Sequence, residues 1–294
     1  MAFNDWDEVR TAFQVARKGT VSGAAQVLGV HHATVIRHID SLEEKLGAKL
    51  FQRHARGYTP TEAGADLLNV AQSTDDQLNQ LASRIRGRGD QVTGDLVITS
   101  LAVLAPLVSP ALAAFQDEHP EVTIKFLTDE RLFRLEYGEA HVAIRAGNPP
   151  DQPDNVVQNF YTQQFGLYAS KEYVARYGKP TSFENLAHHK FICSADETPR
   201  APFFVWLHDN VPAENITYKV NQITAMRPAI EAGLGIGFAG VWDRNEADGL
   251  VQIFAPIPEW DSKLWLVTHV DLHRTPKVQT FVRFLKEYAK SWPT

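Results

Sequence analysis

The sequence of 294 residues contains a single cysteine, Cys193, and no long uninterrupted apolar stretch. One cysteine cannot form a disulfide within the chain, which is typical of a protein kept in a reducing compartment. The apolar neighbours of Cys193 favour a small buried side chain over a redox sensor or a nucleophile. No run approaches the roughly 18 apolar residues of a membrane-spanning helix, and the acidic N-terminus lacks the pattern of a secretory signal. We therefore expect a cytoplasmic protein with no membrane partner.

Motifs of common enzyme classes are also missing. The sequence has no G-x-S-x-G turn, no phosphate-binding glycine loop and no H-E-x-x-H motif. The pairs His31-His32 and His188-His189 could suggest a metal site. Neighbouring side chains point in different directions, however, and there is no second cysteine to act as a ligand. We expect no enzymatic activity, no metal and no cofactor.

Charge is distributed unevenly along the chain. The net charge is −6, yet residues 1–60 hold 8 Lys or Arg against 6 Asp or Glu, a net of +2. An excess this small supports a nucleic-acid partner only weakly. The case for DNA binding therefore depends on the sequence motifs.

The N-terminal segment predicts three helices. Residues 5–18 carry an apolar stripe at helical spacing, formed by Trp6, Val9, Phe13 and Ala16. A short second helix is expected to begin at Ser22 as its N-cap and to end at Gly29. The third helix, which Gly47 ends, has an apolar inner face of Val35, Ile39, Leu42 and Leu46.

The spacing of the second and third helices predicts a helix-turn-helix. Two helices that cross about a tight turn need a small residue, a turn glycine and a branched apolar residue, and Ala25, Gly29 and Val35 stand at these places. The alternative is a generic pair of helices. The following stretch, an apolar piece ending in Phe51 and then residues 52–58, favours a wing whose arginines Arg53 and Arg56 lie against phosphates or in the minor groove.

Residues 6–64 resemble the DNA-binding domain of the LysR-type transcriptional regulators. The motif that carries the resemblance is A-A-Q-V-L-G-V-H-H-A-T-V-I-R-H-I-D-S-L-E-E-K-L-G-A-K-L-F-Q-R followed by G-Y-T-P-T-E-A-G. The resemblance implies a dimer that places two recognition helices in successive major grooves of double-stranded DNA.

By this resemblance the base-reading positions are His32, Ala33, Ile36 and Arg37, and the wing cation is Arg56. Arg37 suits a guanine edge, whereas Thr34 suits a phosphate. The sequence departs from the family pattern at two positions, because the family commonly has Gln at position 32 and a small hydroxyl residue at position 36. The target sequence therefore stays open.

A long helical pattern from Thr61 to about Arg86 follows. Its seam recurs at spacings of four and three, as in a coiled coil, and is formed by Leu67, Ala71, Thr74, Leu78, Leu81 and Ile85. Polar outer faces favour a dimer contact over a helix packed only on its own domain. Gly87, Gly89 and Gly94 mark a hinge.

Beyond Thr93, strands alternate with helices, as in α/β folds. The predicted strands are 96–99, 122–127, 142–144, 164–169, 190–194, 216–220, 235–239 and 264–270, and the predicted helices are 105–117, about 130–137, and 276–289. This part resembles the effector-binding domain of the same family, which is built like a type 2 periplasmic binding protein. One departure is His141, where the family often has an acid.

A small-molecule effector is expected at the carboxyl ends of the strands, where helix N-termini favour anions. Ser100 and Leu101 follow the first strand, and Thr128 should face them across the cleft. The resemblance adds Arg145, Ala146, Phe204, Asn221 and Gly240 to the lining. Hydroxyls and a helix dipole indicate a carboxylate or another anion.

The expected fold is thus α/β with an N-terminal all-α winged helix-turn-helix and a C-terminal two-lobed domain. The expected domains are 1–60 for DNA binding, 61–92 for the linker helix and hinge, and 93–294 for effector binding, with lobe I at 93–163 plus 268–294 and lobe II at 164–267. The expected function is a transcription regulator that forms a homodimer or homotetramer. The alternatives are a solute-binding protein of the same two-lobed fold and a winged-helix regulator of another family.

Overall fold

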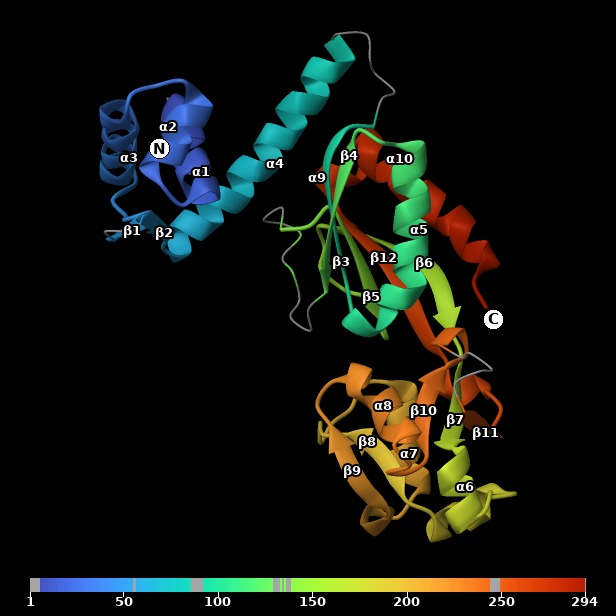
Figure 1. The fold of residues 1–294 in the computed structure, drawn as a ribbon. Helices are drawn as coiled ribbons and strands as arrows, with labels where there is room; N and C mark the ends of the chain where they lie inside the picture. Colours follow the sequence, from blue (N-terminus) through green and yellow to red (C-terminus); the bar gives the residue numbers. More distant parts are fainter. Residues whose placement is uncertain are drawn as a thin grey trace. The chain divides into compact units, whose positions relative to one another are not determined.

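The computed structural model describes residues 6–54, 57–85, 92–128, 133, 135, 139–243 and 249–293. The chain divides into two compact units (Figure 1). The first comprises Met1–Gln91 and Arg134–Glu139, and the second comprises Val92–Phe133 and Ala140–Thr294.

The first unit is a winged helix-turn-helix followed by a long helix. Its elements are α1 (Trp6–Lys18), α2 (Val21–Leu28), α3 (His32–Leu46), β1 (Phe51–His54), β2 (Gly57–Pro60) and α4 (Glu62–Ile85). The strands β1 and β2 form an antiparallel hairpin in which Phe51 pairs with Pro60. This arrangement confirms the predicted helix-turn-helix and wing.

The crossing of α2 and α3 depends on the three residues that the spacing singled out. Ala25 and Val35 are buried, and Gly29 ends α2 with φ +66°, a left-handed conformation that glycine adopts without steric cost. The predicted N-cap was wrong by two residues. Thr20, not Ser22, caps α2, because its extended backbone lets its hydroxyl accept the N–H of Gly23 at 3.1 Å.

The predicted seam of α4 divides into two parts. Leu67 and Ala71 pack into the core of the first unit, whereas Leu78 is 55% exposed. Trp6 of α1, which we expected on the apolar stripe, is 60% exposed. The first half of the seam therefore covers its own domain, and the second half leaves an apolar side chain at the surface.

The second unit contains a mixed five-stranded sheet with the strand order β4-β3-β5-β12-β6. Its strands are β3 (Gly94–Ser100), β4 (Val122–Thr128), β5 (Val142–Ala146), β6 (Asn155–Gln163) and β12 (Ser262–His269). β3 is parallel to β4 and β5, and β12 is antiparallel to β5 and β6. The helices α5 (Ala105–Glu118) and α10 (Pro276–Tyr288) pack on this sheet and on each other, with Phe115 and Phe281 in edge contact at 5.1 Å.

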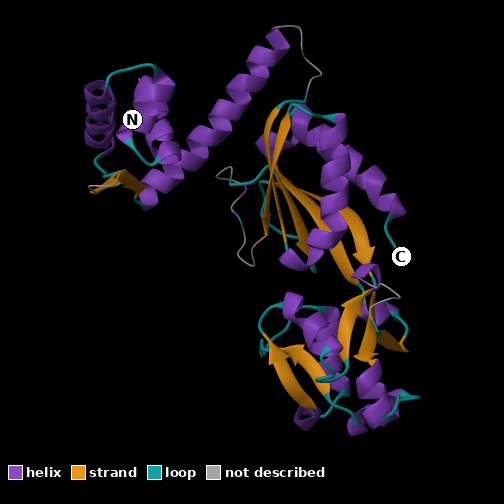
Figure 2. Ribbon diagram, viewed as in Figure 1, coloured by secondary structure: helices purple, strands orange, loops and turns teal. Residues whose placement is uncertain are grey.

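A second hydrophobic core includes residues of two smaller sheets, whose strands are drawn in orange in Figure 2. β7 (Phe165–Ser170) lies between β10 (Gly237–Gly240) and β11 (Leu250–Phe254), and β8 (Phe191–Ser194) pairs with β9 (Ile216–Val220). The helices α6 (Lys171–Tyr177), α7 (Pro202–Asn210), α8 (Met226–Glu231) and α9 (Val270–His273) complete the unit. Cys193 is fully buried, and burial raises the pKa of its thiol, so its expected packing role is confirmed.

The chain crosses between the two cores at two adjacent places. It passes from β6 to β7 at Gln164 and returns from β11 to β12, and Ser262 of β12 is the register partner of Gln163 of β6. The lobe boundary expected after residue 267 needs correction, because β12 pairs with β5 and β6 and so belongs to the first sheet from Ser262 on.

The predicted helix at about 130–137 falls mostly outside the described residues. No helix among the described residues is long and apolar enough to cross a membrane.

Candidate DNA-binding surface and effector site

The first turns of α3 present the predicted base-reading residues on one exposed face. His32, Ala33, Ile36 and Arg37 are all exposed, and Thr34 is half-buried. The opposite side of α3 supplies core residues such as Val35, and helical periodicity therefore turns the reading positions outward. His31 is the N-cap of α3 but makes no capping hydrogen bond with its side chain.

The wing is fixed to the core by its first strand. Phe51 is buried and its ring lies 5.8 Å from that of Tyr58 on the opposite strand. Arg56, the predicted wing cation, lies outside the described residues. Arg53, the other predicted cation, is on β1.

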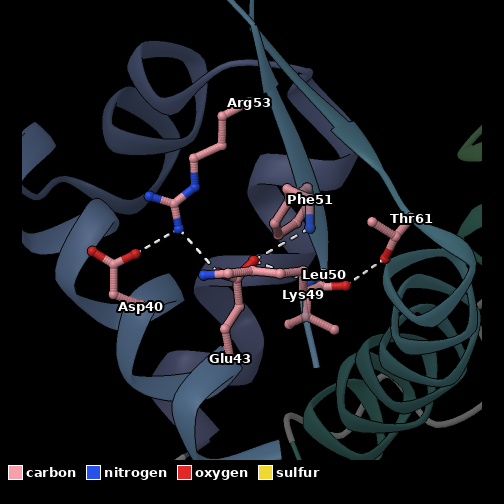
Figure 3. A network of polar contacts seen from close by, with 7 residues as sticks. All are labelled: Asp40, Glu43, Lys49, Leu50, Phe51, Arg53 and Thr61. Carbon is pink, nitrogen blue, oxygen red and sulfur yellow. Dashed lines mark hydrogen bonds and ion pairs between the residues drawn. The ribbon is translucent and has the colours of Figure 1, made fainter. Parts of the chain in front are cut away.

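Arg53 has partners within the protein (Figure 3). Its Nη2 atom donates to Asp40 Oδ1 at 2.5 Å and to Glu43 Oε2 at 3.1 Å, and its guanidinium lies 5.5 Å from the centre of the Tyr58 ring. The hydrogen bond from Arg53 to Asp40 raises the pKa of the guanidinium. Arg53 therefore joins the wing to α3, a role that we had not expected.

Glu43 is the centre of the same network. Its side chain is only 2% exposed and accepts hydrogen bonds from Lys49 Nζ at 2.7 Å, from the Leu50 N–H at 3.0 Å and from the Phe51 N–H at 3.3 Å. Burial alone would raise the pKa of this carboxyl, but the hydrogen bonds from Lys49, Leu50 and Phe51 outweigh it and hold the pKa below its ordinary value. The Glu43 carboxylate thus fixes the start of the wing relative to α3.

The burial of Glu43 could have been predicted from the sequence. Glu43 lies four residues after the buried Ile39, so helical spacing places it on the inner face of α3. A charged residue on an otherwise apolar face needs partners inside the fold. A second buried carboxylate, Glu8 of α1, follows the same logic, because it accepts hydrogen bonds from Ser41 and Lys45 of α3.

In the second unit, a cavity of about 180 Å³ lies between the two cores. It is lined by Leu101, Ala102, Val103, Thr128, Gln222, Ile223 and Thr224. The first three residues open a short 3-10 helix, Ala102–Leu104, that leads directly into α5, and the last three open another, Ile223–Ala225, that leads into α8. First-turn amides have no partner within their own helix, and the residues on both walls of this cavity stand at such first turns.

Two of the predicted effector residues line this cavity, Leu101 and Thr128. Thr128 does not face Ser100 across a cleft as we expected, because the two are register partners on the adjacent parallel strands β3 and β4. Ser100 itself is fully buried, and its hydroxyl has no hydrogen-bond partner among the described residues. The opposite wall comes from residues 222–224, which we did not predict.

The other predicted effector residues lie elsewhere. Phe204 is buried in the core of the second lobe. Arg145 donates to the Phe133 carbonyl at 3.4 Å, and burial lowers the pKa of its guanidinium. Asn221 is exposed and directly precedes the cavity residues, and Ala146 is exposed at the end of β5. Gly240 is buried against Trp242, whose indole nitrogen lies 2.4 Å from where a Cβ atom would stand.

The histidines singled out from the sequence have ordinary surroundings. His31 and His32 are exposed, as is His188, while His189 is buried beside Tyr173. His141 is buried and its Nδ1 accepts the Val97 N–H at 2.8 Å, so this position does hold a strand contact. In the part of the chain that the structure describes, no group of three or more His, Cys, Asp or Glu could hold a metal ion.

Comparisons with known proteins agree on both units. Residues 6–74 match the model "Bacterial regulatory helix-turn-helix protein, lysR family", and residues 89–290 match the model "LysR substrate binding domain". The HTH-type transcriptional regulator DmlR of Escherichia coli (strain K12) is 26% identical over 296 residues, which cover 98% of this chain and 95% of that protein.

Solved full-length structures show the same fold. The Vibrio cholerae virulence activator AphB aligns with a TM-score of 0.53 and 21% identity over 97% of this chain and 99% of its own. A full-length OxyR variant from Pseudomonas aeruginosa aligns with a TM-score of 0.71 and 15% identity over 99% and 96%. The chain therefore belongs to the LysR family of DNA-binding transcriptional regulators, which carry an effector-binding domain and are not enzymes.

Proposed function

We propose that this regulator binds double-stranded DNA through the exposed face of α3 and its wing. His32, Ala33, Ile36 and Arg37 would face base edges, since the N-terminal residues of a recognition helix enter the major groove. Their common exposure on the side of α3 away from the core supports this assignment. Arg53 would act by holding the wing in place.

We further propose that the cavity lined by Leu101, Thr128 and residues 222–224 binds a small anionic effector. The observation that favours an anion is the meeting of two helix beginnings at one cavity, because backbone N–H groups and the helix dipole both attract negative charge there. The hydroxyls of Thr128 and Thr224 and the amide of Gln222 would orient the ligand. A ligand that contacts both walls would stabilise one arrangement of the two lobes, and so alter DNA binding.

A thermal-shift screen tests the effector proposal. The full-length protein is heated with short aliphatic and aromatic carboxylates, each paired with its neutral amide. A ligand present at about 100 times its Kd should raise the unfolding midpoint by about 5–10 °C. Stabilisation by the amides equal to that by the carboxylates would contradict an anionic effector.

Two isosteric variants locate the ligand that such a screen finds. Thr128→Val and Thr224→Val remove only a hydroxyl, and each should weaken binding about tenfold if the hydroxyl bonds a charged ligand. Thr123→Val is the matched control, because Thr123 is also exposed on β4 but does not line the cavity. Equal affinity of all three variants would place the ligand elsewhere.

We also propose that α4 contributes to a homodimer or homotetramer. Val70 and Leu78 of α4 are 56% and 55% exposed, and Leu78 and Trp6 line an open groove of about 260 Å³ between α1 and α4. Burying these side chains against a second copy would remove apolar surface from water. Leu78→Glu should shift the species seen by sedimentation toward the monomer, and an unchanged distribution would contradict this contact.

A further inference from the structure

Three apolar side chains stand exposed along the reading face of the first unit. Val30, the residue before the N-cap of α3, and Ile36 are each 38% exposed, and Ala33 between them is exposed as well. They follow one another at intervals of three residues. Val30 and Ala33 also line the same open depression at the surface, and Ala33 and Ile36 are neighbours on one helix face.

We propose that Val30, Ala33 and Ile36 form a methyl-reading strip that binds the 5-methyl groups of thymine bases in the major groove. This inference rests on the proposed DNA-binding face. The thymine methyl is the apolar group that base pairs present in the major groove, whereas the other groups on that edge are hydrogen-bond donors and acceptors.

The chemistry of the strip favours methyl groups over the other surfaces of DNA. Val, Ala and Ile side chains have no hydrogen-bonding group, so pressing them against a phosphate or a base carbonyl would leave a polar atom without its water. Contact with a methyl group instead removes apolar surface on both sides from water. The polar neighbours His32 and Arg37 remain available for hydrogen bonds to adjacent bases.

The placement of the strip separates it from the core. Val35 and Ile39 of α3 are fully buried in the unit, and truncating Ile36 therefore leaves the core intact. The exposed part of these side chains contributes nothing to folding where it stands. Their free energy becomes useful only when a partner covers them.

The test begins with binding sites that the full-length protein selects from a random pool of duplex DNA. We expect A·T pairs at fixed positions in each half-site. Each thymine of the selected site is then replaced by deoxyuridine, which deletes the methyl group and keeps every hydrogen-bonding group. Each methyl that the strip contacts should weaken binding about fourfold when it is deleted.

A cycle of protein and DNA changes assigns each methyl to its side chain. In Ile36→Ala, the deoxyuridine penalty should vanish at one thymine position and persist at the others. Val27→Ala is the matched control, because Val27 is 50% exposed on α2 but lies outside the depression lined by Val30 and Ala33. It should keep every penalty, and the thermal midpoints of both variants should match that of the unchanged protein.

The outcomes separate this inference from the proposed function. If a site is selected and bound but tolerates deoxyuridine at every thymine, the strip does not read methyl groups and the inference is wrong. The same conclusion follows if Ile36→Ala keeps every penalty and Val30→Ala does too. If no sequence is enriched at all, the proposed DNA-binding face fails, and the inference falls with it.

Discussion

Glu43 shows how one buried carboxylate can set the geometry of a DNA-binding surface. Its oxygens accept the N–H groups of Leu50 and Phe51 and contact the cations of Lys49 and Arg53. All four donors follow α3 in the chain, and they include the first residues of the wing. The position of the wing therefore depends on a charged side chain in the last turn of α3.

The pKa of Glu43 predicts a dependence of stability on pH. Because hydrogen bonds hold this pKa below its ordinary value in the folded state, the carboxylate stabilises the fold above the unfolded-state pKa of about 4.3. That contribution is lost as the pH falls through the lower folded-state value. Glu43→Gln should cost about 1–3 kcal/mol at neutral pH, and its difference from the unchanged protein should shrink in acid.

Thermal midpoints measured for both proteins across this acid range check the prediction. Glu8→Gln is a useful comparison, since the pKa of Glu8 is also lowered: burial opposes the shift, but hydrogen bonds from Lys45 and Ser41 outweigh it. If the difference in thermal midpoint between Glu43→Gln and the unchanged protein stays constant as the pH falls, Glu43 does not contribute to the loss of stability in acid.

Arg53 gives a second prediction at the level of single residues. If it positions the wing through the hydrogen bonds of its Nη2 atom to Asp40 and Glu43, Arg53→Gln should weaken DNA binding about tenfold. Arg53→Lys should also weaken binding, because a lysine keeps the charge but has no planar guanidinium to lie over the Tyr58 ring.

Salt dependence distinguishes this role from a phosphate contact. A cation that neutralises a phosphate contributes about 1 to the slope of log Kd against log salt concentration. We expect Arg53→Gln to leave that slope nearly unchanged. A slope reduced by about 1, together with full binding by Arg53→Lys, would instead assign Arg53 to a phosphate.

At the level of elements, the sequence predicted best where apolar periodicity is long and strong. The third helix was expected with its inner face of Val35, Ile39 and Leu42, and α3 buries all three. Strands that are buried on both faces, such as the predicted 142–144, were found as well. In these segments, local pattern and tertiary packing demand the same structure.

The elements that we missed have weaker patterns. β6 is an edge strand with half-buried side chains along most of its length, and β11 is a short strand with little full burial. Neither shows the alternation of a half-buried strand or the run of a buried one. Pairing with β12 and β7 forms them, and those contacts are distant in sequence.

Gly64 allows α4 to approach the backbone of Leu50 closely. It lies in the first turn of α4, and a Cβ atom there would stand 2.0 Å from the carbonyl oxygen of Leu50. Gly64→Ala should therefore displace α4 from Leu50 or destabilise the first unit by at least about 1–3 kcal/mol, as overpacking does elsewhere.

Chemical denaturation of the full chain measures this cost. Gly47→Ala serves as the comparison, because Gly47 has φ +67° but no atom within 4 Å of the added Cβ. Gly47→Ala should lower the free energy of unfolding by only about 1 kcal/mol, which is the cost of placing an alanine in the left-handed conformation. A Gly64→Ala protein as stable as the unchanged chain would show that α4 can move freely away from Leu50.

At the level of the whole molecule, the sequence predicted one wall of the proposed effector cavity and not the other. The strand ends at Leu101 and Thr128 could be located because ligands gather at the carboxyl ends of parallel strands. Residues 222–224 lie about a hundred positions further on, and only the packing of the second lobe brings them to the same cavity. Spacing along a chain does not contain that information.

The separate cores predict separate unfolding. Because the first unit has its own hydrophobic core and the second unit has two others, calorimetry of the full chain should show more than one transition. DNA should raise the midpoint of one transition and an effector that of another, since a ligand stabilises only the folded unit to which it binds. A single transition that both ligands shift equally would contradict independent units.

The two neighbouring chain crossings between the lobes have a mechanical consequence. Because Ser262 lies beside Gln163, the returning strand runs next to the outgoing one. The two lobes are therefore connected by two adjacent segments that together form one hinge. Such a joint allows rotation about one line and resists twisting about others. Closure on a ligand between Thr128 and Thr224 would then have essentially one degree of freedom, so chemically different ligands that fit the cavity would drive the same motion and differ only in its extent.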